Sequence, residues 1–430
     1  MTASRESSPS RRDLLRTSAV AAAAIGTAPY SSAGKVLRPG GAEMLKVGLV
    51  GCGGRGRGAA MNALRADENT KLWALADAFP EPLADAHRYL SEDAGVGARV
   101  DVPEERRFVG FDAYEKLIEQ CDVVLLATSP HFRPLHMEAC VEAGKHIFVE
   151  KPVATDPVGL RRIWAACDRA REKGLSVVSG LCYRYEFAKQ ATVERVWDGA
   201  IGDIVAMQTT YNTGSLWHRG RKPEWSEMEY QMRNWLYFTW LSGDHITEQH
   251  IHSLDKLAWV KGGYPVKATA SGGRVQRTDE KWGNIYDHFN TVYEWEDGVR
   301  GFSSCRQWSG ASNDVSDFVF GSRGTCNLQR HRIEAGSWKW RHRSDEPEDM
   351  YQNEHDVFFA SIRANEPIDN GDYMCESTLM AIMARLAAYT GKTVTREAVL
   401  NSKLDLSPKE YVWGDHECAP IAIPGVTEMI

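Results

Sequence analysis

Three histidines and three carboxylates lie within residues 243–255 of this chain. On a helix, Glu248 and His252 are four residues apart and share one face, with Asp244 a turn before them and Asp255 a turn after. An imidazole beside a carboxylate is suited to moving a proton near neutral pH. We therefore predict a proton-transfer site on a helix over 247–260. A polar helix whose histidines bond one another and the backbone is the alternative.

The same cluster must be tested as a metal site, because histidine, aspartate and glutamate are common metal ligands. His245 and His250 are five residues apart, which directs them to different faces of a helix. The nine cysteines form no CxxC pair that would indicate zinc or a disulfide scaffold. The sequence therefore predicts no metal site.

Two further motifs follow buried strands that we expect at 122–127 and 146–149. Residues 128–131 (Thr-Ser-Pro-His) come after the first strand, and residues 150–152 (Glu-Lys-Pro) after the second. Ligands of a doubly wound sheet bind at the carboxyl ends of its strands. Proline restricts the backbone beside Lys151, so this lysine could aim its ammonium into the cleft. A surface lysine paired with the preceding glutamate is the alternative.

The elements that would position these motifs begin at residue 45. A strand, a glycine turn, a helix and a second strand (71–76) follow one another, and Asp77 ends the series. This order is that of a dinucleotide-binding βαβ unit, in which Gly51 makes the turn, Gly53 admits a pyrophosphate and Gly56 lets the helix pack closely. A carboxylate at Asp77 would accept bonds from the ribose hydroxyls and repel a 2′-phosphate, which favours NAD over NADP.

The residues that we predict to contact this cofactor are Gly51, Gly53, Gly54, Arg55, Gly56, Asp77, Thr128, Pro130, His131, Glu150 and Lys151.

Length and pattern predict an α/β protein with two domains, since 430 residues exceed one simple core. Strands alternating with helices predict a doubly wound domain over 44–182. Long strands at 204–211, 267–275, 289–296, 298–308 and 318–328 predict an α+β domain with a large, mostly antiparallel open sheet over 183–400. Helices are expected at 354–364 and 377–390, and residues 401–430 are expected to form a tail.

Charge and hydropathy limit the partners. A net charge of −7 gives no reason to expect nucleic acid as a partner. Residues 10–16 (Ser-Arg-Arg-Asp-Leu-Leu-Arg) and the apolar run 19–28 resemble a twin-arginine signal, which we place at 1–33. The protein is then expected to be periplasmic or secreted, with no membrane insertion after the signal is removed. A disordered arginine-containing tail is the alternative.

Aromatic and basic residues are dense between Tyr211 and Trp240. Flat aromatic faces can pack on sugar C–H groups, although cores and subunit interfaces enrich aromatics too. We predict Trp217 and Arg233 as substrate contacts. Tyr183 and Arg184, which follow a sixth strand that we expect at 176–181, and Asp244 and His245 complete that set. A structural ion pair is an equal alternative for Arg184.

Together these motifs resemble the glucose–fructose oxidoreductase / inositol dehydrogenase / MocA (Gfo/Idh/MocA) family over residues 45–400. The resemblance implies a Rossmann domain, NAD(P) dependence, hydride transfer on a sugar-like alcohol, and dimers or tetramers formed through the open sheet. It places Lys151 at the catalytic centre and the family's D-x-x-x-H motif on Glu248 and His252, with glutamate as a departure. His252 is the predicted proton acceptor.

Export adds a constraint, because the space outside the cytoplasmic membrane holds no NAD pool. We therefore expect tightly bound NAD that is regenerated within each turnover. The alternatives are an NAD-dependent glycosidase similar to the α-N-acetylgalactosaminidase branch of the family, and a non-catalytic carbohydrate-binding member.

Overall fold

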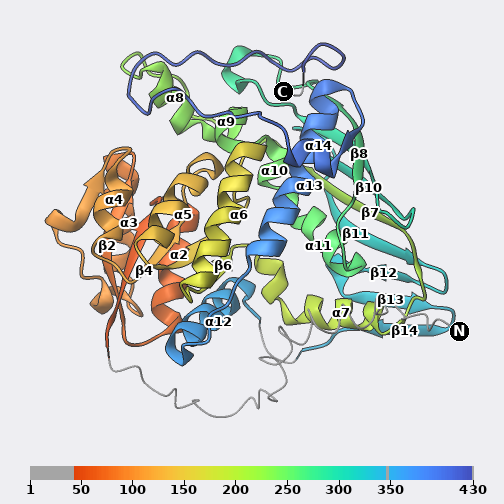
Figure 1. Ribbon diagram of the computed structural model, residues 1–430, viewed down its shortest axis with the longest axis horizontal. Helices are drawn as coiled ribbons and strands as arrows, with labels where there is room; N and C mark the ends of the chain where they lie inside the picture. Colours follow the sequence, from red (N-terminus) through yellow and green to blue (C-terminus); the bar gives the residue numbers. More distant parts are fainter. Residues whose placement is uncertain (1–42, 345–347, 429–430) are drawn as a thin grey trace, which may run out of the picture. The chain divides into compact units, whose positions relative to one another are not determined.

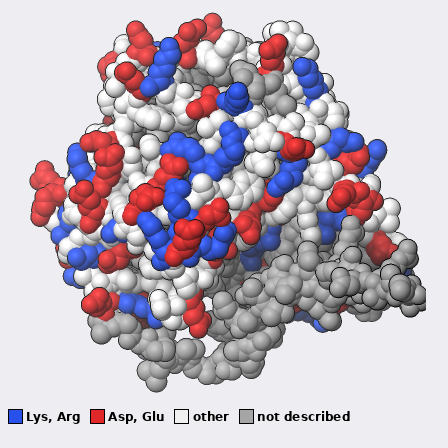
Figure 2. Space-filling view, viewed as in Figure 1, with Lys and Arg blue, Asp and Glu red and all other residues white. Residues whose placement is uncertain are grey.

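The computed structural model describes residues 43–344 and 348–428. The predicted signal at 1–33 lies outside the described residues. Within the described part of the chain, no helix is both long and apolar enough to cross a membrane. Basic and acidic side chains are intermixed on the face seen in Figure 2, without a large region of one sign.

The first sheet has six parallel strands in the order β3-β2-β1-β4-β5-β6 (Figure 1). The strands are β1 (Leu45–Val50), β2 (Thr70–Asp77), β3 (Arg107–Val109), β4 (Val123–Leu126), β5 (His146–Val149) and β6 (Val177–Ser179). The order reverses between β1 and β4, so the carboxyl ends of these two strands flank the crevice where doubly wound sheets bind ligands.

Helices cover both faces of this sheet, as its continuous apolar strands require. One face is covered by α2 (Gly54–Ala66), α3 (Pro80–Ser91) and α12 (Met350–Ala364). The other face is covered by α4 (Ala113–Ile118), α5 (Arg133–Glu142) and α6 (Pro157–Glu172). Helix α12 comes from far along the chain, yet its buried Phe358 and Phe359 join the core beneath β1 and β4.

The second sheet has nine strands and is mostly antiparallel, with one parallel pair between β7 and β10. In sheet order the strands are β14 (Trp338–Arg341), β13 (Arg332–Ala335), β12 (Thr325–Asn327), β11 (Asp314–Gly321), β7 (Ile204–Thr213), β10 (Arg300–Gln307), β9 (His288–Glu294), β8 (Lys267–Gly273) and β15 (Val394–Thr395). The fold class is therefore α/β, as predicted.

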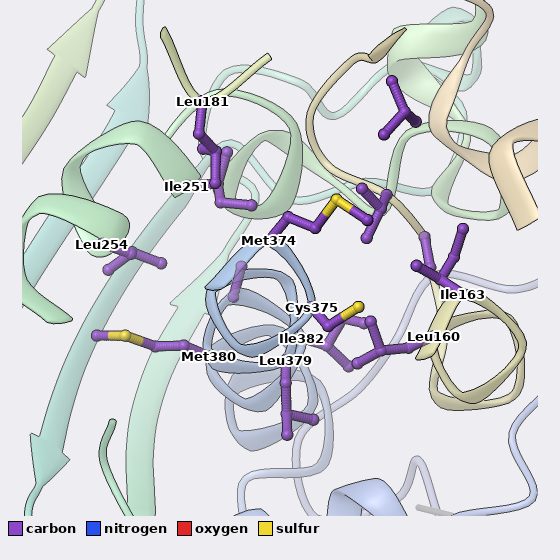
Figure 3. Close-up of a cluster of buried hydrophobic side chains, with 14 of the residues drawn as sticks. Leu160, Ile163, Leu181, Ile251, Leu254, Met374, Cys375, Leu379, Met380 and Ile382 are labelled. Carbon is purple, nitrogen blue, oxygen red and sulfur yellow. The ribbon is translucent and has the colours of Figure 1, made fainter. Parts of the chain in front are cut away.

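The helices of this second part are α7 (Phe187–Trp197), α8 (Glu227–Arg233), α9 (Thr239–Ser242), α10 (His245–Glu248), α11 (Ile251–Lys261), α13 (Gly371–Thr390) and α14 (Arg396–Leu400). Helix α13 is apolar all round and buried, which suits its place between the two sheets. In Figure 3, its side chains Met374 and Met380 lie among residues of α6 and α11, such as Leu160 and Leu254. One continuous core therefore joins the two sheets.

Two predicted elements are divided in the structure. The strand expected at 318–328 is a hairpin of β11 and β12, because the chain turns at residues 322–324. The helix expected over 247–260 is interrupted after Glu248 and resumes at Ile251. The second difference changes the geometry of the predicted site.

The predicted tail at 401–430 packs on the rest of the molecule. The backbone oxygen of Gly414 accepts a bond from the N–H of Met228 in α8 at 3.0 Å, and that of His416 accepts one from Gln231 Nε2 at 2.9 Å. In Figure 1 this dark-blue segment runs past α8 and α9. Residues 404–418 are called the C-terminal segment below.

Candidate functional site

The glycine turn after β1 has the close approaches that a dinucleotide-binding turn requires. Gly51 has a φ of +96°, and a Cβ on Gly56 would lie 1.9 Å from the backbone oxygen of Gly51. A Cβ on Gly53 would instead meet no described atom within 4 Å. No side chain of the described residues caps the start of α2, so its first N–H groups face open space at the positive end of the helix dipole. This space suits a pyrophosphate.

Asp77, at the end of β2, is fixed beside this turn. One carboxylate oxygen accepts the backbone N–H of Cys52 at 2.7 Å, and the other accepts that of Phe79 at 2.9 Å. Burial raises the pKa of Asp77, and these two bonds oppose the increase. Each oxygen keeps a lone pair for a further donor. The carboxylate is therefore held where ribose hydroxyls would reach it.

A cavity of about 180 Å³ opens at the carboxyl ends of β1, β2 and β4. It is lined by Gly51, Gly53, Asp77 and Thr128 among others. Thr128 Oγ1 is buried and has no hydrogen-bond partner among the described residues. An orphaned hydroxyl beside an open helix terminus fits a polar ligand. The predicted NAD site is thus compatible with the residues present.

Two residues of the 128–131 motif face away from open space. His131 is buried and bonds the hydroxyl of Tyr411 in the C-terminal segment at 2.9 Å. Burial lowers the pKa of His131 to about 3, which keeps its imidazole neutral. Pro130 starts a short 3₁₀ turn and is also buried. Their contacts are structural, whereas Thr128 and Ser129 line the cavity.

Arg55 and Glu150 bind each other across the site. Arg55 donates to Glu150 and, at 2.8 Å, to Glu354 of α12, while Tyr351 lies 4.8 Å from the guanidinium. Burial works against the charge of Arg55, but the two carboxylates raise its pKa. Arg55 therefore joins α2 to α12 rather than pointing to a phosphate. Sequence reasoning missed Glu354, which is 299 residues away.

Lys151, at the end of β5, meets α10 from the second part of the chain. Its ammonium donates to the backbone oxygen of Glu248 at 2.5 Å and to Oε1 of the same residue at 3.0 Å. The side chains of both residues are 14% exposed, so the pair is mostly buried and still reached by solvent. Glu150 does not pair with this ammonium, because its carboxylate is taken by Arg55. The structure brings together two of the three predicted catalytic residues.

His252 lies next to this pair, although not through the predicted helical spacing. His250 N donates to His245 O at 3.1 Å, a bond across five residues that adds a π-type turn between α10 and α11. Burial, followed by the charge of Lys151, lowers the pKa of His252 well below its ordinary value. Its Nδ1 has no partner among the described residues. The imidazole is therefore neutral and able to accept a proton.

Tyr183 and Arg184 differ in what they contact. The ring of Tyr183 lies edge-on to His252 with a centroid distance of 5.3 Å, which keeps it at the site. Arg184 donates to both carboxylate oxygens of the buried Asp255, at 2.9 and 2.8 Å. These are the contacts of the structural ion pair that we named as the alternative for Arg184. Asp255 also accepts from Ser377 at 2.7 Å, so it holds α11 to α13.

Asp244 and His245 are both buried, and the contacts of Asp244 do not fit the predicted substrate role. Asp244 accepts from the backbone and ring of His245, from Tyr286 N and from the hydroxyl of Tyr389, at 2.6 to 3.0 Å. It has a φ of +69° and begins α10. A fully satisfied, fully buried carboxylate cannot also bind a substrate. These two residues instead fix the position of Glu248.

The aromatic segment contributes to the cofactor cavity through residues other than those predicted. Arg219, Met232 and Trp235 line the cavity, together with Phe79 and Phe111. Trp217 is 43% exposed and packs on Trp235, with ring centroids 6.2 Å apart. Arg233 lies over Phe79 at 4.1 Å and pairs with Glu229 and Glu81. Trp217 and Arg233 thus pack behind residues that line the cavity and do not line it themselves.

The comparisons with known proteins agree with this geometry. The profile "Oxidoreductase family, NAD-binding Rossmann fold" matches residues 45–179, and the profile "GFO/IDH/MocA C-terminal domain" matches residues 190–327. An uncharacterized oxidoreductase of Streptococcus pneumoniae is 25% identical over 49% of this chain and 56% of its own length, so the chain spans about half of that relative. Inositol 2-dehydrogenase 3 of Saccharopolyspora erythraea is 27% identical over 66% of this chain and 73% of its own length.

The chain is also similar to one further relative over a shorter stretch and to two solved structures. Glycosyl hydrolase family 109 protein 1 of Bacteroides fragilis is 28% identical over 41% of this chain and 36% of its own length. Aldose-aldose oxidoreductase from Caulobacter crescentus, complexed with glycerol, superposes with a TM-score of 0.64 at 21% identity, over 82% of this chain and all of the other. Scyllo-inositol dehydrogenase from Lactobacillus casei, with bound NAD(H) and scyllo-inositol, superposes with a TM-score of 0.62 at 18% identity. The superposition covers 83% of this chain and 99% of the other. The chain belongs to the Gfo/Idh/MocA family of oxidoreductases, and its first domain is an NAD-binding Rossmann fold.

Proposed function

We propose that this protein is an NAD-dependent oxidoreductase that acts on a CH–OH group of a sugar or sugar-like polyol. The observation that carries the proposal is the contact between Lys151 and Glu248, with the neutral His252 beside them. Lys151 follows β5 at the carboxyl edge of the sheet, where the cavity beside the glycine turn also opens. An ammonium and a proton acceptor at the end of a nucleotide cavity are the groups that alcohol oxidation needs.

The residues would divide the reaction as follows. NAD supplies the hydride acceptor when it is bound. His252 takes the proton of the substrate hydroxyl, since its imidazole is neutral at pH 7. The ammonium of Lys151 stabilises negative charge on the substrate oxygen as the carbonyl forms. Glu248 holds that ammonium in place through its carboxylate and its backbone oxygen.

Tight cofactor binding and export by the twin-arginine route belong to the same proposal. The twin-arginine route carries proteins already folded, and an exported enzyme needs a nucleotide that does not dissociate. The C-terminal segment supports retention, because Trp413 packs on Phe79 and Phe111 with centroid distances of 5.2 and 4.5 Å. Both phenylalanines line the cavity. The segment therefore holds the outer wall of the NAD site in place.

Changing Trp413 to alanine is expected to raise the dissociation rate of NAD about tenfold, because each aromatic pair contributes about 0.5–1.5 kcal/mol. The rate is measured from cofactor fluorescence after dilution of the loaded protein. Val412→Ala is the matched control, since Val412 is 55% exposed in the same segment. Equal dissociation rates in the Trp413 variant and the wild type would show that the segment does not retain the nucleotide.

Two other functions are weighed against this one. An NAD-dependent glycosidase would use the same residues for a transient oxidation, and the partial match to a family 109 glycosyl hydrolase favours keeping this candidate. A non-catalytic carbohydrate-binding member is disfavoured by the contact between Lys151 and Glu248.

The deciding experiment has two steps. Mass spectrometry of denatured, freshly purified protein identifies the released nucleotide, which we expect to be NAD. The bound cofactor is then followed by absorbance while myo-inositol, D-glucose, D-glucuronate and N-acetyl-D-galactosamine are added in turn. Reduction of the cofactor by any of them supports the oxidoreductase, whereas hydrolysis of nitrophenyl glycosides without net reduction supports the glycosidase. Protein that binds no nucleotide even with excess NAD contradicts both.

The acid limb of kcat/KM is expected well below pH 6.5. His252 must be neutral to accept a proton, and burial together with Lys151 lowers its pKa well below 6.5, so the neutral form persists as the pH falls. A pH profile with half-maximal kcat/KM at 6.5 or above would contradict this. In Lys151→Met the His252 pKa, followed by NMR, should rise toward 6.5 because the neighbouring positive charge is gone.

The open face of the second sheet supports assembly into dimers or tetramers. It exposes Val292, Phe302 and Phe320, and the first two line a shallow depression of about 420 Å³. Apolar side chains gathered on one sheet face commonly mark a protein–protein contact. We include a homo-oligomer in the proposal for this reason.

A further inference from the structure

A chain of three side chains leads from a buried arginine in the loop after β8 to the residue after Glu248. The guanidinium of Arg277 donates to Gln307 Oε1, and Gln307 Nε2 donates to Gln249 Oε1 at 2.5 Å. Arg277 is 2% exposed and Gln307 is fully buried, whereas Gln249 is half-buried. The chain therefore runs from buried groups to a half-buried one that directly follows Glu248.

The direction of these bonds is fixed by chemistry. A guanidinium can donate hydrogen bonds but cannot accept them. Arg277 therefore requires the oxygen of the Gln307 amide, which leaves the nitrogen of that amide to face Gln249. Gln249 must then turn its own oxygen to Gln307. Its Nε2, with two N–H groups, is directed away from the buried chain.

The amide nitrogen of Gln249 is the free end of this chain of side chains. Gln249 follows Glu248 directly in the chain, and the Glu248 backbone oxygen binds Lys151. Among the described residues Gln249 Nε2 has no hydrogen-bond partner, and it is not an enclosed atom. The turn that interrupts the helix between α10 and α11 includes this residue, so its side chain does not follow the regular helical face. The residue next to Glu248 thus holds a donor pair that has no acceptor among the described residues.

We infer that Gln249 donates a hydrogen bond from Nε2 to an oxygen of the substrate, and that Arg277 and Gln307 are positioning residues that hold it in this orientation. The inference rests on the proposed function, since it takes Lys151 and Glu248 as the reacting centre. It assigns the site a fixed polarity: acceptors at Glu248 and His252, and donors at Lys151 and Gln249. A substrate oxygen next to the reacting carbon would be bound at Gln249.

Gln307→Glu tests the orientation without removing volume. The new carboxylate still accepts from Arg277 but cannot donate to Gln249, so Gln249 turns its nitrogen to residue 307 and presents its oxygen to the substrate. We expect KM to rise about tenfold, the factor of one neutral hydrogen bond, with kcat within about threefold. The melting temperature should not fall, because the buried guanidinium gains an ion-pair partner. A purely structural role would change stability and leave KM unchanged.

Gln249→Met removes the donor directly and should raise KM by a similar factor. The double variant should be no worse than either single variant, since both remove the same bond. Gln120→Glu, on the far side of the first domain, is the control for an added charge. All are assayed with the panel member that the wild type oxidises best.

The outcomes separate the two proposals. A wild type that reduces its bound NAD with no panel member contradicts the proposed function, and the inference falls with it. An active wild type whose Gln249→Met and Gln307→Glu variants keep KM within twofold overturns the inference alone.

Discussion

Lys151→Met is expected to lower kcat by about 10²–10⁴-fold, the range typical of a group that acts directly on the reacting atoms. The ammonium binds Glu248 at 3.0 Å and lies at the carboxyl edge of the parallel sheet, where it would stabilise charge on the substrate oxygen. Methionine keeps most of the side-chain volume but carries no charge. NAD binding should be retained, because the glycine turn and Asp77 are unchanged.

His252→Asn should reduce kcat by a similar factor, and the double variant should lose little more, since the two residues act in one step. Single-turnover reduction of bound NAD measures the chemical step without product release. Lys116→Met is the matched control, because Lys116 forms an exposed ion pair with Asp112 and is not among the residues that line the cavity. A kcat within tenfold of the wild type in either site variant, with NAD bound, would mean that these residues do not perform the chemistry.

The dinucleotide-binding unit could be predicted because its signals are local. Gly51 and Gly56 are required by the backbone itself, and Gly53 leaves open space in front of α2. Asp77 ends a strand whose apolar run is visible in the sequence. Strands buried on both faces and separated by helices leave few other arrangements. Because ligands of a doubly wound sheet bind at the carboxyl ends of its strands, the sequence also placed Lys151 and Thr128 at one edge of the sheet. Local pattern and topology were therefore sufficient for this half of the site.

The interruption of the predicted helix could not be read from the sequence, because distant contacts determine it. Gln249 bonds Gln307 and His250 bonds Ser303, across 58 and 53 residues of sequence. These bonds to β10 replace the regular helical path between Glu248 and Ile251. The residue types in the motif were informative about chemistry, while their spacing misled about geometry.

The contacts of Arg55 and of the C-terminal segment also could not be predicted from the sequence. Arg55 lies in the glycine turn and was predicted to bind the cofactor, but α12 brings Glu354 to it from 299 residues away. Trp413 and Tyr411 carry no motif, yet they pack on Phe111 beside the cavity. No periodicity in residues 401–430 could indicate that contact. Pairings between segments far apart in the chain need the folded structure.

Gly53→Val is expected to weaken NAD binding by more than about 100-fold while the melting temperature of the nucleotide-free protein stays the same. The φ of Gly53 is −67° with an extended ψ, a conformation open to valine, and its added Cβ would meet no described atom within 4 Å. The branched side chain would occupy the space in front of the first N–H groups of α2. Those groups are where a pyrophosphate would bind, so the substitution removes the ligand and leaves the fold.

Gly56→Ala is the matched contrast in the same turn. Its Cβ would lie 1.9 Å from the backbone oxygen of Gly51, so it must displace α2 from β1 and lower the melting temperature with or without NAD. Thermal unfolding and NAD titration of both variants therefore distinguish a loss of NAD binding from a loss of packing between α2 and β1. If Gly53→Val binds NAD as the wild type does, the pyrophosphate does not rest against α2. The hydride acceptor would then have no defined place beside Lys151 and His252, and the proposed reaction would lose its geometric basis.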